Sequence, residues 1–401
     1  AILGLDGNQL AALLPDHEMR ERFIRYVVAR YSAFNVTWQL VQEFEEYENG
    51  RAFCREMGQL VKQIDPYGHP RTTHTTSTSA PLLPDGWMDH VLYQSSDDQL
   101  GSIEHQLYGV PFVNAEFAYE DSGAGKSHPH HVDTATFRKR LWNSTMDGEY
   151  PTFGNTGVYG GRKVPKDLNQ LESPGAKQMT AWFDFFAGTR YWELEPFFDL
   201  DGGRAVALPG VEYIVYVEKP EGPIEVRIQR AGYDVRWFNP TTGQFVPQKG
   251  YKGERWTGEA PNREQDWVLH ISREDRKQGM LRSWKFESRP NLLQEVEAIA
   301  AKTPFDIAQP GDVVRAGKPE PYEAKLRRET RGTRAMMYLW TLDAVTDSQG
   351  YLVVGTGATG SMTVPEPFLH GGSEAPATLR VLGMNANGKV YELNKSITVK
   401  R

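Results

Sequence analysis

The sequence is poor in cysteine and contains no long apolar run. Cys54 is the only cysteine among 401 residues, so an internal disulfide framework is excluded. Apolar residues recur around Cys54 with helical spacing, and we interpret it as a small core residue instead of a catalytic thiol. No run of about eighteen apolar residues occurs, which argues against a membrane-spanning helix.

Positive charge is also scarce. Forty-five Lys and Arg against 52 Asp and Glu give a net charge of -7, and no long basic block occurs. The electrostatic footprint of a nucleic-acid-binding protein is therefore absent. Aromatic residues are abundant, with 18 Phe, 18 Tyr and 10 Trp. Sugars are suitable partners for them, because the C–H faces of sugar rings stack on aromatic rings.

Strands and helices alternate through the first half of the chain. A helical pattern covers 16–31, with Asp16 as its N-cap, and a second amphipathic helix covers 51–64. We expect strands near residues 1, 36, 71, 91, 111 and 152. This alternation predicts parallel βα units and a (β/α)8 barrel. The barrel needs eight strands and about six are found, so we expect its first βα units to be lacking. Ala1 lies directly at a strand, with no initiator Met and no signal peptide before it.

The pattern changes after residue 203. Alternating apolar and polar residues, separated by Pro, Gly and Asn, predict an antiparallel β-sandwich over the next ninety or so residues. Further strand-like segments follow 304, with Asn387-Gly388 as a hairpin turn. We therefore expect three domains. Their ranges are 1–200 for the incomplete barrel, 201–293 for the β-sandwich and 304–401 for a second small β domain.

Two glutamates occupy matching positions at strand ends. Glu43 is the first acidic residue after the apolar run 36–41, and Glu116 holds the same place in the run 111–120. In a barrel, functional residues lie at the C-terminal ends of the strands. Glycosidic bond cleavage needs one carboxyl to donate a proton and a second to attack or stabilise the anomeric carbon. We assign Glu43 as general acid/base and Glu116 as nucleophile, which gives a retaining mechanism if they lie about 5 Å apart.

A structural role is the alternative for either glutamate, because strand-end carboxylates often form salt bridges at a barrel rim. Neighbouring acidic residues fall in loops, and for them a solvated surface position is expected. These residues are Glu45, Glu46, Glu48 and Glu120.

Several polar and aromatic residues near these strand ends suit sugar binding. His74 could bind a sugar hydroxyl or hold a carboxylate, although a core or rim histidine is an equal alternative. Tyr93 could hydrogen-bond the nucleophile, and Trp87 and Tyr119 lie beside rim loops where a ring could stack on a sugar. The full set of expected substrate-binding residues is Gln42, His74, Trp87, Tyr93, Gln94, Asn114 and Tyr119.

Two further stretches have the composition of a cofactor site but lack the spacing that such a site needs. The loop 127–133 contains His128, His130, His131 and Asp133, but no familiar zinc spacing, so we expect it to shape the rim instead of binding a metal. The Gly-rich stretch 154–161 lacks the Gly-Lys-Ser/Thr ending of a phosphate-binding loop. We expect no metal and no cofactor.

At these residues the chain resembles a known family. The segments 29–43, 69–74 and 111–117 are similar to the apiosidase-like catalytic domain, a (β/α)8 barrel of glycoside hydrolases acting on plant-type polysaccharides. The region 179–273 resembles the module that commonly follows it, labelled a collagen-binding domain. The resemblance implies a carboxylate after barrel strand four and a glutamate after strand seven, which match Glu43 and Glu116. Many related barrels have Asn before the acid/base, where this chain has Gln42.

The sequence thus predicts a secreted or periplasmic, retaining glycoside hydrolase that cleaves plant-type or other complex polysaccharides. The alternative is a non-catalytic carbohydrate- or matrix-binding protein with a degenerate barrel. A collagen-degrading protease is set aside, because no nucleophile triad and no zinc motif are found.

Overall fold

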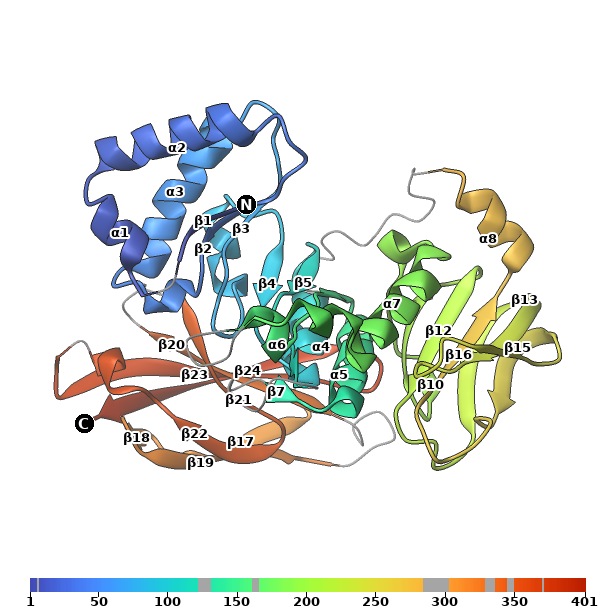
Figure 1. The fold of residues 1–401 in the computed structure, drawn as a ribbon. Helices are drawn as coiled ribbons and strands as arrows, with labels where there is room; N and C mark the ends of the chain where they lie inside the picture. Colours follow the sequence, from blue (N-terminus) through green and yellow to red (C-terminus); the bar gives the residue numbers. More distant parts are fainter. Residues whose placement is uncertain are drawn as a thin grey trace. The chain divides into compact units, whose positions relative to one another are not determined.

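The structure is a computed structural model that describes residues 1–5, 7–121, 131–160, 166–283, 303–328, 336–344, 350–369 and 371–401. The chain folds into two compact units (Figure 1). Unit 1 combines residues 1–115 with 294–401, and unit 2 covers 116–293. Among the described residues, no helix has the length and apolar character needed to cross a bilayer.

The N-terminal part of unit 1 alternates short strands with helices, as expected. Its elements are β1 (Ile2–Gly4), α1 (Gln9–Leu13), α2 (His17–Tyr31), β2 (Trp38–Val41), η1 (Phe44–Glu46), α3 (Gly50–Ile64), β3 (Arg71–Thr72), η2 (Ala80–Asp85), β4 (Val91–Tyr93), α4 (Asp98–Leu107) and β5 (Phe112–Asn114). The strands β1, β2 and β3 pair in parallel, and so do β4 and β5. The prediction of parallel βα units is confirmed here, while a complete barrel is not seen within either unit as far as the described residues extend.

Local sequence explains the first helices. The side chain of Asp16 accepts a hydrogen bond from the Met19 N–H at 2.8 Å, which confirms the predicted N-cap of α2. Helix α3 buries its apolar face against α2 and β2, and Cys54 is fully buried in that core. Burial raises the pKa of the Cys54 thiol to about 12, so the group is protonated at neutral pH. The interpretation of Cys54 as a core residue is confirmed.

The C-terminal module, residues 304–401, is made of strands in two sheets. Its elements are β17 (Phe305–Gln309), β18 (Val313–Arg315), β19 (Pro319–Leu326), β20 (Met337–Ala344), β21 (Tyr351–Thr356), β22 (Thr359–Thr363), η6 (Glu366–Leu369), β23 (Glu374–Met384) and β24 (Val390–Lys400). The sheet orders are β17-β19-β22 and β18-β24-β23-β20-β21. The expected turn at Asn387-Gly388 closes the β23–β24 hairpin, where the Gly388 N–H donates to the Asn385 carbonyl at 3.0 Å.

Unit 2 joins helices of the expected barrel to the expected β-sandwich. Its elements are β6 (Tyr119–Glu120), β7 (His131–Val132), α5 (Thr134–Met146), β8 (Glu149–Pro151), α6 (Thr156–Tyr159), η3 (Leu168–Glu172), α7 (Pro174–Ala187), η4 (Tyr191–Glu193), β9 (Glu195–Phe197), β10 (Leu200–Asp201), β11 (Arg204–Leu208), β12 (Glu212–Val217), β13 (Ile224–Phe238), β14 (Phe245–Pro247), β15 (Tyr251–Gly258), β16 (Trp267–Ser272) and α8 (Glu274–Met280). The strands β9 to β16 pair antiparallel, as predicted.

One strand of the sandwich differs from the prediction. The residues 224–228 and 233–238 each alternate in the way that predicts a separate strand of the sandwich, but β13 runs continuously through both. Its first half pairs with β15 and its second half with β14 and β16, with a register irregularity between Arg227 and Ala231. The two halves of this long strand therefore pair with different strands of the sandwich.

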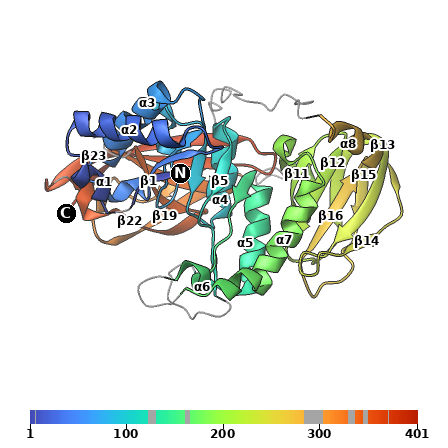
Figure 2. The same cartoon turned by 45° about the horizontal axis from the view of Figure 1, so that its top comes forward.

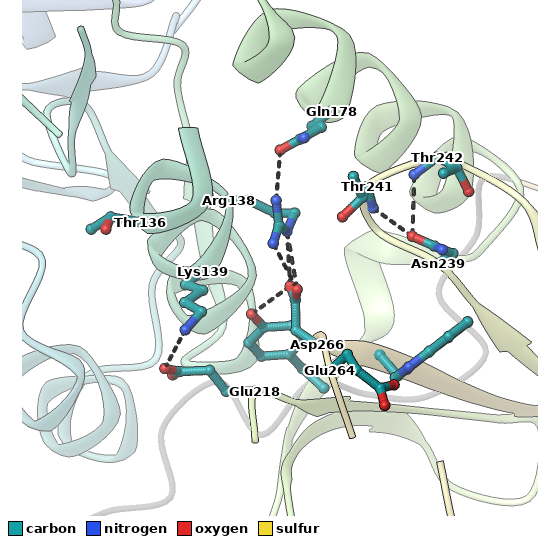
Figure 3. Close-up of polar contacts among 12 residues, drawn as sticks. Thr136, Arg138, Lys139, Gln178, Glu218, Asn239, Thr241, Thr242, Glu264 and Asp266 are labelled. Atoms are coloured by element: carbon teal, nitrogen blue, oxygen red, sulfur yellow. Dashed lines mark hydrogen bonds and ion pairs between the residues drawn. The ribbon is translucent and has the colours of Figure 1, made fainter. Parts of the chain in front are cut away.

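Helices α5 and α7 lie side by side and pack on the sandwich (Figure 2). Trp142 of α5 stacks on Tyr216 of β12 with ring centroids 5.8 Å apart, in a core that includes Phe185 of α7. A buried ion pair reinforces this core. Arg138 of α5 donates to both carboxylate oxygens of Asp266, at 2.9 Å from Nε and 2.8 Å from Nη2 (Figure 3).

The Arg138–Asp266 pair is supported by neutral partners. The Tyr216 hydroxyl donates to Asp266 at 3.0 Å, and Arg138 Nη1 donates to the Gln178 side-chain oxygen at 3.2 Å. Asp266 is 1% exposed. Because a buried charge needs such partners, the pair makes α5 and the sandwich interdependent.

The Asp266→Ala variant should lose about 3–5 kcal/mol of unfolding free energy, because the Arg138 guanidinium would stay buried without its carboxylate. Urea denaturation measures this loss. The matched control is Lys139→Ala, which removes a more exposed pair with Glu218 at 3.5 Å and should cost less than about 1 kcal/mol. Equal losses in the two variants would show that the buried pair is not what joins helix and sandwich.

Candidate active site

The C-terminal ends of β2 and β3 bring Glu43 and His74 onto adjacent backbone segments in unit 1. The His74 N–H donates to the Val41 carbonyl at 3.0 Å, and the Phe44 N–H donates to the His74 carbonyl at 3.2 Å. On the other side of β2, the Gln42 N–H donates to the Gly4 carbonyl at 3.0 Å. The backbone that carries Glu43 is therefore held between two neighbouring strand ends.

The backbone of Glu43 lies in the left-handed region, with φ 47° and ψ 68°. Non-glycine residues rarely adopt this conformation, which costs on the order of 1–3 kcal/mol. The turn redirects the chain from β2 into η1. Strained residues of this kind concentrate at functional sites, and the Glu43 side chain is half-buried.

Glu45 is not the solvated surface residue that the sequence suggested. Its side chain accepts hydrogen bonds from the Thr75 hydroxyl and, at 3.0 Å, from the Thr76 N–H. Burial raises the pKa of Glu45 to about 7, although these bonds and the nearby His74 oppose the rise. Glu45 therefore holds a proton over part of the neutral pH range, a property of general acids in glycosidases. Glu45 lies four positions after the end of β2. Its burial depends on the segment after β3, which the local sequence pattern does not reveal.

The other acidic residues of this stretch behave as expected. Glu46 and Glu48 are exposed, and Glu46 accepts a hydrogen bond from the Gly7 N–H at 3.0 Å. Gln42 is half-buried, and its side-chain oxygen accepts from the Gln39 amide at 3.1 Å. His74 is 2% exposed, which fits a positioning role better than open contact with a sugar.

Tyr93 is not placed as predicted. It is fully buried, stacks on Phe112 at 5.5 Å, and donates its hydroxyl to Glu104 of α4 at 2.8 Å. The Tyr93 hydroxyl therefore points toward helix α4, because Glu104 supplies a buried acceptor there. Asn114 is 1% exposed and donates to the Ser95 carbonyl at 2.7 Å, and Gln94 is half-buried.

Trp87 corrects a second expectation. It is fully buried and packs so closely on α3 that a Cβ added to Gly58 would lie 2.3 Å from its ring. The absence of a side chain at Gly58 lets the ring enter the core, so Trp87 offers no open face to a sugar. Trp38 of β2 is also fully buried.

In unit 2, Glu116 is paired with Tyr119. The Tyr119 hydroxyl donates to Glu116 Oε2 at 3.0 Å, so Tyr119 takes the part that the sequence assigned to Tyr93. Its ring contacts Tyr159 of α6 edge-on, at 5.5 Å between centroids. Tyr159 is 54% exposed and was not predicted, although it lies in the Gly-rich stretch that was considered for phosphate binding. Tyr119 thus contacts both Glu116 and the partly exposed ring of Tyr159.

Glu120 is buried and saturated with hydrogen bonds, which corrects its expected surface position. It accepts from the Thr134 hydroxyl at 2.6 Å, the Gly175 N–H at 2.7 Å, the Asn155 amide at 3.3 Å and the Ser173 hydroxyl. A Cβ at Gly175 would lie 2.4 Å from the Glu120 carboxyl carbon. Glu120 therefore anchors the N-terminus of α7 and is distinct in role from Glu116.

The stretches considered for cofactors have structural roles where they are described. Asp133 caps α5 by accepting from the Thr136 N–H at 2.7 Å, and Asn155 caps α6. His131 lies in β7, while His128 and His130 fall outside the described residues. Over the ranges that the structure describes, His, Cys, Asp and Glu side chains form no group of three suited to a metal ion.

Unit 2 also contains an aromatic recess of about 630 Å³ next to β8 and α7. Its wall includes Tyr150, Trp182, Phe183, Tyr191 and Trp192. Tyr150 and Tyr191 are 37% and 41% exposed, so parts of their rings are accessible. Recesses of this size accept small ligands, and ring faces of this kind suit stacking on apolar or sugar rings.

The raised pKa of Glu45 predicts a pH-dependent stability. The folded state retains the Glu45 proton above the unfolded pKa of 4.5, so unfolding free energy should fall as pH rises from about 4.5 to about 7. The Glu45→Gln variant should lose this slope, gaining up to about 3 kcal/mol relative to the unmutated chain near neutral pH. Urea denaturation across this range measures it, with exposed Glu48→Gln as the control. Identical slopes in both variants would contradict the burial of Glu45.

Comparisons with known proteins address the family and the fold of this chain. Residues 7–193 match the family described as apiosidase-like, catalytic domain. The comparison with curated proteins finds no match. A solved glycoside hydrolase family 5 protein from Bacteroides vulgatus ATCC 8482 shares 17% identity, covering 67% of this chain and 70% of that chain with a TM-score of 0.56. Another solved glycoside hydrolase shares 17% identity over 67% of this chain and 71% of its own, with a TM-score of 0.55.

At this identity the solved structures show a shared fold, of the TIM-barrel class. The resemblance of 179–273 to a collagen-binding module stays a prediction, and so do the domain boundaries. The family match over 7–193 and the fold shared with glycoside hydrolases together support the assignment of this chain as a glycoside hydrolase.

Proposed function

We propose that the chain hydrolyses glycosidic bonds by a retaining, two-carboxylate mechanism, with Glu43 as general acid/base and Glu116 as nucleophile. The observation that carries the proposal is the left-handed backbone at Glu43, the second residue after the parallel strand β2. The strained backbone conformation fixes the direction in which the half-buried Glu43 carboxylate leaves the chain, as a proton-transferring group requires. Hydrolysis then needs only the two carboxyls and water, without a cofactor.

The surroundings of Glu116 fit a nucleophile. A hydroxyl that donates to a carboxylate favours its ionised form, and Tyr119 supplies such a donor to Glu116. In the first step Glu116 attacks the anomeric carbon while Glu43 protonates the leaving oxygen. In the second step Glu43 removes a proton from water, which displaces Glu116 from the sugar. The two residues belong to different units, so their cooperation is part of the proposal.

Glu45 is a second candidate for the proton donor, favoured by its pKa of about 7. Its carboxylate is already bonded to Thr75 and Thr76, however, and this favours a supporting role. In that role Glu45 ties η1 to the segment after β3. Glu43 and Glu45 variants separate these assignments.

We further propose a carbohydrate substrate of the complex, plant-type polysaccharide class. Tyr119 and Tyr159 lie together beside Glu116 and suit stacking on a sugar ring. Gln42 and Gln94, half-buried near strand ends, suit contacts with sugar hydroxyls. Because polysaccharides of this kind are extracellular, a secreted or periplasmic location belongs to the same proposal.

The test compares Glu43→Gln and Glu116→Gln with the exposed control Glu48→Gln on aryl glycosides and a plant polysaccharide panel. We expect kcat to fall by about 10²–10⁴-fold in Glu43→Gln, as for loss of a general acid/base, and at least as much in Glu116→Gln. Sugar binding, measured by calorimetry, should be retained. An aryl glycoside with a good leaving group should suffer less in the Glu43 variant, because its departure needs no proton.

Unchanged hydrolysis in either variant would reject the assigned roles. Loss in Glu45→Gln but not in Glu43→Gln would transfer the acid role to Glu45. Binding without hydrolysis by the unmutated chain would favour the alternative of a non-catalytic carbohydrate-binding protein.

A further inference from the structure

Helix α4 of unit 1 carries a fully buried carboxylate, Glu104. It accepts hydrogen bonds from the Thr78 hydroxyl at 2.6 Å, the Tyr93 hydroxyl at 2.8 Å and the Tyr351 hydroxyl at 2.5 Å. Burial raises the pKa of Glu104, and the three hydroxyls oppose that rise. A buried carboxylate is costly unless such donors surround it. One of the three donors, Tyr351, comes from the C-terminal module.

A second contact lies at the other end of the same strand. Strand β21 begins at Tyr351 and ends at Thr356, whose hydroxyl donates to Asp97. Asp97 is the N-cap of α4, and its other oxygen accepts from the Gln99 N–H at 2.9 Å and the Leu100 N–H at 3.2 Å. Both ends of β21 are therefore bonded to one helix, so the strand and the helix are held at two points.

A third contact comes from the neighbouring strand. The Tyr338 N–H of β20 donates to the side-chain oxygen of Gln99 at 3.0 Å, and α4 packs against β20, β23 and β24. These contacts link residues that are more than 200 positions apart in the sequence, since Tyr351 and Glu104 are separated by 247 positions. The C-terminal module is thus built onto α4 by specific side chains.

The segment before α4 leads from these contacts toward the candidate active site. The Asp97 N–H donates to the Ser95 hydroxyl at 3.1 Å, and the Ser95 carbonyl accepts from Asn114 at 2.7 Å. Next along the chain, the Ala115 N–H donates to the Tyr93 carbonyl at 2.9 Å. Ala115 immediately precedes Glu116. A continuous set of hydrogen bonds therefore joins the module to the residues that lead into Glu116.

We infer that the C-terminal module is a positioning part of the catalytic region, in which Tyr351, Thr356 and Glu104 fix α4 and the loop after β4. Tyr351 and Glu104 are positioning residues, because they act through Tyr93 and Asn114. A binding module on a free tether would not need a buried carboxylate shared with a barrel helix. The effect on catalysis rests on the proposed function, whereas the effect on α4 does not.

Two variants of the full chain test the inference, Tyr351→Phe and Thr356→Val. Each removes one hydroxyl donor and keeps the side-chain shape. Tyr391→Phe is the matched control, because its hydroxyl contacts Asn385 within the β23–β24 hairpin at 3.4 Å. Hydrogen exchange followed by mass spectrometry should show α4 amides exchanging about tenfold faster in both test variants, as expected when a buried acceptor loses one of its hydrogen-bond donors. The control should leave α4 unchanged.

Kinetics on a short aryl glycoside provide the second readout. We expect kcat to fall by about tenfold or more in Tyr351→Phe, with KM changed less than about twofold, because a small misplacement near the reacting groups affects the chemical step. The inference would be overturned if KM rose on polymers while kcat on the short glycoside stayed unchanged. That result would indicate a tethered binding module.

Unchanged α4 exchange in both test variants would also overturn it, and so would faster exchange with full activity. If the unmutated chain hydrolyses none of the glycosides, the proposed function fails. The exchange experiment still decides whether the module holds α4.

Discussion

The left-handed turn at Glu43 is the constraint on which the candidate active site depends. It ends β2, and it is held because the flanking residues bond to Gly4 on one side and to His74 on the other. The conformation costs on the order of 1–3 kcal/mol, which the neighbouring strand ends must offset. The same turn starts η1, where Glu45 becomes buried against Thr75. The turn at Glu43 thus links the pairing of the strand ends, the backbone strain at Glu43 and the burial of the Glu45 carboxylate.

Carboxylates serve two physical purposes in this chain. Glu104, Glu120 and Asp266 are fully or almost fully buried, and each accepts several hydrogen bonds that fix neighbouring elements. Glu43 and Glu116 are half-buried, and each is the second residue after the end of a strand. A carboxylate saturated by fixed donors has little capacity to exchange protons with a substrate. The degree of burial thus separates the anchoring carboxylates from the candidates for chemistry more sharply than position near a strand end does.

The sequence was informative where structure depends on local pattern. Periodicity and the Asp16 cap predicted α2, and alternation predicted the antiparallel strands of unit 2. Side-chain environments were harder to predict, because they depend on partners distant in sequence. Trp87 is buried through the small size of Gly58, and Tyr93 is turned toward a helix by Glu104. The contacts between α4 and the C-terminal module left no local signal at all.

The central claim is that Glu116 attacks the sugar while Glu43 transfers the proton. A slow fluorinated glycoside that traps the covalent intermediate tests it most directly, with tandem mass spectrometry of the labelled peptide to locate the adduct. The account predicts one sugar bound to Glu116, and none on the saturated Glu120 of the same peptide. A label on Glu120, or turnover of the parent glycoside with inverted configuration and no adduct, would contradict it.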